Sequence, residues 1–185
     1  MNTLKLIALA MMLAATPLIS ACGGGGHGHS KNAVDTSKGA AELPADYVEG
    51  QKTLKVAQDF LQAAGSGDGD TLNKLMADDF VWHNEGDPTI PWIGTWEGKK
   101  VVFGEFMPAF GAGLTATSWT TDYSMASGNQ AIFMGSMSAT ANNSGAETGV
   151  FSWAVRVHVE DGKVKSWNWF EDSFAVSQAY HSAKK

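Results

Sequence analysis

Cysteine is almost absent from this sequence: Cys22 is the single thiol among 185 residues. A disulfide framework or a cysteine-ligated zinc site needs several thiolates that converge on one point, so both are excluded. Charged residues are also sparse, at 17%, and the formal net charge is −6. An acidic chain of this kind does not favour nucleic acid or an anionic membrane surface as a partner. Hydrophobic residues make up 44%, which indicates a single globular domain with a core.

The N-terminus lacks the roughly 20 apolar residues that a membrane-spanning helix needs. Its apolar run covers residues 6–18 and follows Lys5, which is typical of a secretory signal. The run closes on Leu18-Ile19-Ser20-Ala21-Cys22, which resembles the lipobox of bacterial lipoproteins. The resemblance implies a signal peptide over 1–21 and lipidation of Cys22. An ordinary signal followed by a stray cysteine is the alternative.

Gly23 follows the cysteine where some lipoproteins carry Asp. In a Gram-negative host the resemblance therefore implies export to the periplasmic side of the outer membrane, with membrane contact through the lipid anchor only. Glycine-rich and polar sequence then predicts a flexible tether over 22–50. His27 and His29 are two possible metal ligands there, but two ligands on such a segment make a weak site. We predict no metal, because no other His/Asp/Glu set has ligand spacing, and no nucleotide or other cofactor, because no phosphate-binding glycine loop is present.

The folded domain is predicted over 51–183, and its hydrophobic periodicity changes along the chain. Helical spacing from Gln51 ends at Gly65 and Gly67, and Asp68 or Asp70 can cap a second short helix. A strand at 80–83, a loop with two prolines and a third helix over about 97–110 follow. Four strands over 114–127, 130–141, 147–160 and 163–172 and a closing helix over 174–182 complete an α+β order with helices on one side of an antiparallel sheet.

The Asp161-Gly162 turn predicts a two-residue hairpin that pairs Glu160 with Lys163. This register sorts both strands by face. The nearly apolar face, expected to meet the helices, holds residues 151, 153, 155, 157, 166, 168, 170 and 172. The opposite face mixes charges with Trp167 and Trp169 and also holds Glu171, which suits a subunit interface. We therefore predict a homodimer through the outer sheet face.

The element order, the segment 78–83, the segment 94–99 and the last strand over 162–172 together resemble the nuclear transport factor 2-like superfamily, and within it the SnoaL-like domains. The likeness covers about 52–182. It implies a strongly bent antiparallel sheet that forms a cone, a cystatin-like α+β roll with helices on its concave side. It also implies a mostly apolar pocket inside the cone and, in many members, dimerisation through the outer face.

The enzymes of this superfamily match the chain only in part. Limonene-epoxide-hydrolase-like members share Gly162, Trp167 and Asp172, yet residues 131–141 contain neither the arginine nor the second aspartate that they need. Ketosteroid-isomerase-like members have a tyrosine where this chain has Phe60, and their oxyanion-binding aspartate is missing here. Polyketide cyclases use one acid/base aspartate, and the chain meets that requirement.

Two residues are the candidates for catalysis. Asp172 falls on the predicted apolar face, where loss of solvent raises a carboxyl pKa, and Asn168 on the same face is a possible orienter. Asp172 equally suits the N-cap of the last helix. His83 ends the first strand and suits proton transfer, with a structural histidine as the alternative. Trp82 and His83 point to opposite sides, so one of them faces the pocket. His158 is expected on the outer face, and His181 in solvent.

Seven tryptophans in one small domain favour an aromatic ligand pocket. Packing in the core explains most of these tryptophans when each is considered alone, but their number in one small domain favours the pocket. The resemblance implies pocket positions for Trp82, Trp92, Trp96, Phe106, Phe110 and Trp153, and the predicted apolar face adds Asn168 and Phe170. The sequence therefore predicts a lipid-anchored domain that binds a small, mainly apolar molecule, with isomerase, cyclase or hydrolase chemistry if Asp172 and His83 act. The alternative is a non-catalytic carrier or protein-interaction module of the cell envelope.

Overall fold

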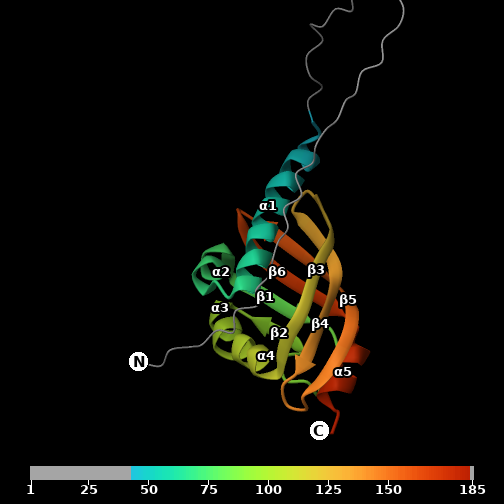
Figure 1. Ribbon diagram of the computed structural model, residues 1–185. Coiled ribbons are helices and arrows are strands. Elements are labelled where there is room, and N and C mark those ends of the chain that lie inside the picture. The colour runs from blue at the N-terminus through green and yellow to red at the C-terminus, as the bar shows by residue number, and fades with distance from the viewer. Residues whose placement is uncertain (1–42, 184–185) are drawn as a thin grey trace, which may run out of the picture.

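The computed structural model describes residues 43–183 (Figure 1). The predicted signal peptide, Cys22 and the tether as far as residue 42 lie outside the described residues. No helix in the described part is both long and apolar enough to cross a membrane. The elements follow in the order α1 (Ala45–Ser66), α2 (Gly69–Leu75), β1 (Met76–Asn84), β2 (Gly94–Glu97), α3 (Lys99–Val101), the π-helical turn η1 (Val102–Phe106), α4 (Met107–Gly113), β3 (Leu114–Ser127), β4 (Gln130–Ala141), β5 (Ala146–Glu160), β6 (Lys163–Glu171) and α5 (Ser173–Tyr180).

Helix α1 lies along the concave side of the bent sheet, with α2 to α4 beside β1 and β2 and with α5 near the far end of β5 (Figure 1). It begins at Ala45, inside the predicted tether, and buries Ala57, Phe60 and Leu61. It ends at Gly67, whose φ of 71° is a left-handed conformation that glycine adopts without steric cost. Asp68 caps α2 by accepting a 3.0 Å hydrogen bond from the Thr71 amide, which confirms one of the two predicted caps.

The third predicted helix is divided in the structure. Its first residue, Glu97, ends the short strand β2, which the sequence pattern did not predict. The helical residues are α3, η1 and α4 in succession. Pro108 lies in the first turn of α4 and has no amide hydrogen to donate to the preceding turn. A π-helical turn directly before it accommodates that missing hydrogen bond within a continuous helix.

The six strands form one sheet in the order β2-β1-β6-β5-β4-β3. The four C-terminal strands pair antiparallel, as predicted, and both predicted two-residue turns are present at 128–129 and 161–162. Strand β1 pairs parallel with β6 and antiparallel with β2. The first strand is thus inserted beside the last one. This long-range pairing closes the wide curve of the sheet around α1.

A β-bulge in β6 inverts the face assignment that the hairpin turn predicted. Glu160 pairs with Lys163 and Val159 with Val164, but His158 then pairs with Ser166. Lys165 is therefore an extra residue in β6, and a shift of one residue turns every later side chain to the other face. Trp167, Trp169 and Glu171 consequently share the concave face with Trp153, Val155 and Val157. Asn168 and Phe170 lie on the convex face, contrary to the prediction.

The bulged residue is held by an ion pair. The Lys165 ammonium contacts both carboxylate oxygens of Asp79. Asp79 lies where β1 also changes register against β6, between Met76 and Val81. This partner lowers the pKa of the Asp79 carboxyl. The pair therefore joins two irregular stretches of neighbouring strands.

Aromatic side chains fill the part of the cone beneath α1. Phe60 of α1 lies 5.2 Å from Trp167 and 5.7 Å from Phe80, measured between ring centroids. Trp82 lies 5.3 Å from Trp167 and 4.6 Å from Phe106. All five rings are buried. The hollow expected from the resemblance is thus a packed core in this region.

Candidate ligand site

The predicted catalytic aspartate caps a helix. Asp172 is exposed, and its Oδ1 accepts hydrogen bonds from the amides of Phe174 at 3.1 Å and Ala175 at 3.3 Å. These bonds satisfy amide groups that the first turn of α5 leaves free. Of the two roles that the sequence allowed, the structure gives Asp172 the N-cap. The predicted burial on the apolar face is wrong, because the bulge at Lys165 displaces the end of β6.

His83 lies on the convex face of the sheet, and Trp82 is the residue that faces the interior. His83 Nδ1 is 2.7 Å from Thr95 Oγ1, and its Nε2 is 3.1 Å from Glu85 Oε1. Neither contact involves Asp172. The structure therefore does not bring the predicted catalytic pair together.

The predicted pocket residues divide between the two faces. Trp82 and Phe106 belong to the buried aromatic cluster, and Trp96 lies 5.8 Å from Phe106. Trp92 is buried against Phe110 and Tyr180, at 6.1 and 5.5 Å. The two residues that were placed by the hairpin register are wrong. Asn168 accepts a 3.4 Å hydrogen bond from Arg156 on the convex face, and Phe170 is 41% exposed there.

Three tryptophans from different strands stack on the concave face. Trp153 lies 4.3 Å from Trp119 and 5.1 Å from Trp169, and the third pair is 5.6 Å apart. Their planes differ by 13° to 30°. Trp153 is buried, whereas Trp119 and Trp169 are half-buried. We call these three residues the tryptophan platform.

Gly135 of β4 makes room for the platform. A Cβ atom there would lie 2.0 Å from the Thr120 carbonyl oxygen and 2.9 Å from Cζ2 of Trp153. Both distances are shorter than the contacts that Cβ atoms make in proteins. Any larger residue at position 135 must therefore displace the backbone of β3 or the indole of Trp153. A glycine between β3 and β5 therefore lets Trp153 reach Trp119 across β4.

Glu171 lies beside the platform. It is the cross-strand partner of Trp153, and its Oε2 accepts a 2.8 Å hydrogen bond from Trp169 Nε1. Burial raises the pKa of the Glu171 carboxyl to about 7, and the charge of Asp172 adds to this effect, against the opposing hydrogen bond from Trp169. A carboxyl that titrates near neutral pH beside an apolar surface is a typical functional-site candidate. The Glu171 carboxyl can therefore donate or accept a proton near neutral pH.

The sequence pattern placed Glu171 on the outer face and so missed it. The signal was present in the apolar spacing of β6. Val164, Trp167 and Trp169 are separated by three and then two positions, whereas an uninterrupted strand keeps a period of two. One extra residue between Val164 and Trp167 restores the alternation. The same reading puts Glu171 on the face of Trp169.

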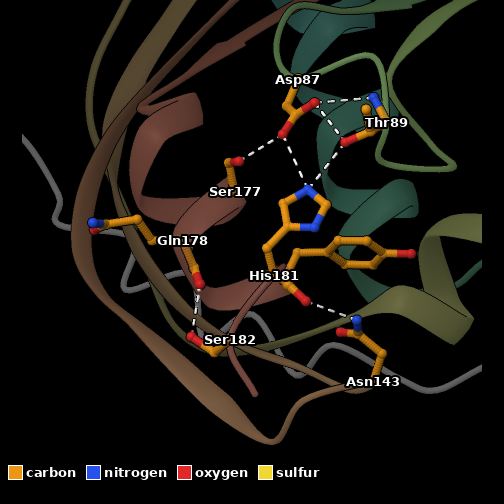
Figure 2. A network of polar contacts seen from close by, with 8 residues as sticks. Asp87, Thr89, Asn143, Ser177, Gln178, His181 and Ser182 are labelled. Carbon is orange, nitrogen blue, oxygen red and sulfur yellow. Dashed lines mark hydrogen bonds and ion pairs between the residues drawn. The ribbon is translucent and has the colours of Figure 1, made fainter. Parts of the chain in front are cut away.

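A polar network holds the C-terminal helix to the loop after β1 (Figure 2). Asp87 Oδ2 accepts a 2.6 Å hydrogen bond from Ser177 and lies 3.2 Å from His181 Nε2. Its Oδ1 accepts from the amide and the hydroxyl of Thr89, at 3.0 and 2.7 Å. These bonds hold the pKa of the Asp87 carboxyl well below its usual range. In a catalytic triad the histidine accepts a hydrogen bond from the serine, but here Ser177 and His181 both contact the carboxylate of Asp87. The network therefore has a structural role: it holds α5 against the loop.

Two histidines, His158 and His181, lie where the sequence placed them. His181 is exposed, as predicted, and its Nε2 also lies 3.2 Å from Asp87 Oδ2. His158 lies on the convex face, as predicted, with Nε2 2.9 Å from the Asn129 side-chain amide. Within residues 43–183, no three His, Cys, Asp or Glu side chains are grouped to hold a metal ion.

Two hollows on the surface of the described chain lie away from the platform. The larger is an open groove of about 1150 Å³ between the first half of α1 and the turn that joins β5 to β6. The smaller, of about 410 Å³, lies between α2 and the start of the α3 helix. The platform itself is a partly buried surface on the concave face of the bent sheet.

A bent six-stranded sheet with α1 on its concave side and an ionisable group among aromatic residues defines a nuclear transport factor 2-like domain. The model of the SnoaL-like domain family matches residues 57–167, more than half of the chain. The chain therefore belongs to the SnoaL-like domain family, as the sequence motifs indicated. A search of the curated proteins finds no match at a significant level.

Solved structures agree on the fold. An NTF2-like protein from Burkholderia xenovorans LB400 matches with a TM-score of 0.65 at 20% identity, covering 71% of this chain and 98% of that one. A protein of unknown function with a cystatin-like fold from Xanthomonas campestris matches with a TM-score of 0.56 at 24% identity, covering 69% and 96%. An LEH-like epoxide hydrolase from M. tuberculosis matches with a TM-score of 0.54 at 17% identity, covering 71% and 91%. The chain thus shares its fold with these three proteins.

Proposed function

We propose that the domain binds a small, mainly apolar molecule against the tryptophan platform, and that Glu171 exchanges a proton with it. One observation carries the proposal: the Glu171 carboxyl, with its pKa near 7, lies directly beside Trp153 and Trp169. Stacked indole rings offer a flat apolar surface to a ligand. The carboxyl of Glu171 supplies an ionisable group at that surface.

Proton transfer of the isomerase, cyclase or hydrolase kind suits this arrangement. A group whose pKa is close to the working pH is effective both as an acid and as a base. The structural similarity to an epoxide hydrolase supports chemistry on this fold, although the fold alone does not specify a reaction. Glu171 takes the role that the sequence pattern assigned to Asp172.

The flat ketone 2-tetralone tests binding and proton transfer together, because its α-protons exchange with solvent. We expect 2-tetralone to shift the indole resonances of the platform when it is added to the purified full chain. We also expect the protein to accelerate the exchange of the α-protons of 2-tetralone in deuterated buffer. Glu171→Gln keeps the resonance shift and slows the exchange by about a hundredfold, a usual contribution of one acid-base group. Glu147→Gln, which removes an exposed carboxyl of β5, is the matched control and retains the activity.

Two results would contradict the proposal separately. Equal exchange rates for the wild type and Glu171→Gln exclude the proton transfer and leave a carrier. Unchanged indole resonances exclude the platform as the binding site.

A protein-interaction role has its own support on the convex face. Tyr123, Met134, Ala154 and Phe170 are successive cross-strand partners over four strands. Tyr123 is 66% exposed and Met134 is 44% exposed. Apolar side chains in a continuous exposed row are typical of an interface. The occupant that we propose is a second copy of the chain, which gives a homodimer.

The lipid anchor on Cys22 also remains a proposal, supported by the residues 18–22 of the sequence. Labelled palmitate fed to the producing bacterium is expected to enter the wild-type protein and not Cys22→Ser. In the same cells the wild type is expected to sediment with the outer membrane, and the variant is not. Equal labelling of both proteins would show that Cys22 is not the lipidated residue.

A further inference from the structure

Among the described residues, no positively charged side chain pairs with Glu171. None of the ion pairs of the described chain includes Glu171. The charged neighbour that acts on its carboxyl is Asp172, which has the same sign. Trp169 donates to Oε2, and no donor among residues 43–183 forms a hydrogen bond with Oε1. When Glu171 is ionised, its charge is therefore uncompensated.

The basic side chains of the neighbouring strands are directed elsewhere. Arg156 lies on the convex face, where it donates to Asn168. Lys165 pairs with Asp79, and Lys163 donates to the carbonyl oxygen of Lys74. The concave face around Glu171 instead carries Trp153 and the other indoles. A partner of opposite charge must then come from outside the described residues.

Indole rings attract cations as well as apolar groups. The face of an aromatic ring is electron-rich, and tryptophan binds a cation more strongly than tyrosine or phenylalanine does. Two of the three platform rings are half-buried and so within reach of a ligand. An ionised carboxyl next to such faces combines ion pairing with cation–π attraction. This combination is selective for one ligand class.

The polar groups at the site favour an ammonium that lacks N–H donors. A primary ammonium has three donors that need three acceptors. The described side chains at the site offer two acceptor groups, the Glu171 carboxylate and Thr121 Oγ1, and the hydroxyl also accepts from Trp119 Nε1 at 3.2 Å. The unpartnered Nε1 of Trp153 is a donor and cannot serve an ammonium. A methylated ammonium needs no acceptors and presents apolar methyl groups to the rings. The indole surface therefore fits it better than it fits a lysine-like group.

We propose that the ligand of this domain carries a methylated organic ammonium group, held between the Glu171 carboxylate and the indole faces of the tryptophan platform. The inference rests on the proposed ligand site and specifies its ligand class.

Choline and 3,3-dimethylbutan-1-ol test the proposal, because they have the same shape and differ by the charged nitrogen. Calorimetric titration of the purified full chain at pH 8.5, with the indole resonances recorded in parallel, measures both affinities. We expect the wild type to bind choline about tenfold or more tightly than its neutral analogue. Glu171→Gln is expected to lose that preference while it still binds the neutral alcohol. Glu147→Gln removes an exposed carboxyl of β5 and keeps the preference.

Each other outcome has a defined meaning. Equal affinities in the wild type, or a choline preference that survives Glu171→Gln, overturn the ammonium proposal. Binding of 2-tetralone without binding of either alcohol also overturns it, while the ligand site stands. If none of the three molecules shifts the indole resonances, the proposed function fails together with the inference.

Discussion

Trp169 Nε1 donates a 2.8 Å hydrogen bond to Glu171 Oε2, two residues further along the same strand. The two side chains share a face because they are two positions apart, and the bulge at Lys165 makes that face the concave one. The bond fixes the carboxyl against an indole that is itself stacked on Trp153. A single inserted residue thus determines which acidic group lies at the aromatic surface.

Glu171→Gln is expected to make stability less dependent on pH. The folded-state pKa of Glu171, about 7, is above the ordinary value of 4.5 for a glutamate, so its contribution to stability is complete below pH 4.5 and is lost as pH rises through 7. At pH 8.5 the variant should be more stable than the wild type by up to about 3 kcal/mol, and at pH 4 the two should agree. Urea unfolding at both pH values measures the difference. A gain of the same size at both pH values, or for the exposed Glu147→Gln, would contradict the assignment.

Gly135→Ala is expected to disrupt the tryptophan platform. The added methyl group would meet the Thr120 carbonyl oxygen and the ring of Trp153, so the variant should lose about 1 to 3 kcal/mol of stability. Near-ultraviolet circular dichroism should show a weaker signal from the stacked indoles. Gly111→Ala is the matched control, since a Cβ there meets nothing within 4 Å and the helix gains propensity. An unchanged dichroism signal for Gly135→Ala would show that the stack does not need this glycine.

Asp87→Asn is expected to loosen α5. The folded-state pKa of Asp87 is lowered, so the carboxylate contributes stability above its ordinary pKa, and this contribution is lost as pH falls through the folded value. The variant should melt earlier at pH 7, with a smaller difference at pH 3, and the amides of α5 should exchange faster with deuterium. Asp59→Asn, which removes an exposed pair with Lys55, is the control and should change little. Unaltered exchange in α5 would show that the network does not hold the helix.

Met134→Lys is expected to weaken the proposed homodimer. Met134 lies in the middle of the exposed apolar row, where a buried charge without a partner is costly. Analytical ultracentrifugation should show a dimer for the wild type and a larger monomer fraction for the variant. Val48→Lys changes a residue of nearly equal exposure on α1 and should leave the mass unaltered. A monomeric wild type at high concentration would contradict the dimer.

Much of the secondary structure was predictable because its signals are local. The turns at 128–129 and 161–162 and the cap at Asp68 depend on residues next to one another in the chain. The short strand β2 was missed because four residues with mixed burial carry too little pattern. The parallel position of β1 beside β6 was missed because it joins residues about eighty positions apart.

The sequence predicted which types of residue form the candidate site, namely tryptophans and an acidic residue, but not which particular residues meet there. Trp153 lies on the concave face as expected, and the acidic residue beside it is Glu171 rather than Asp172. A hairpin turn determines register only up to the first bulge, and beyond Lys165 every side chain is reversed. Trp119 was missed because it lies on β3 and reaches Trp153 on β5 only across β4, at the position of Gly135.

The amino-acid sequence alone determined the family and most of the order of elements, since each depends on neighbouring residues or on a motif of fixed spacing. The meeting of Trp119, Trp153, Trp169 and Glu171 was decided only in the folded chain. Three strands, a bulge and a glycine must be in place before these side chains share one surface. Their proximity is a property of long-range pairing, which no local pattern encodes.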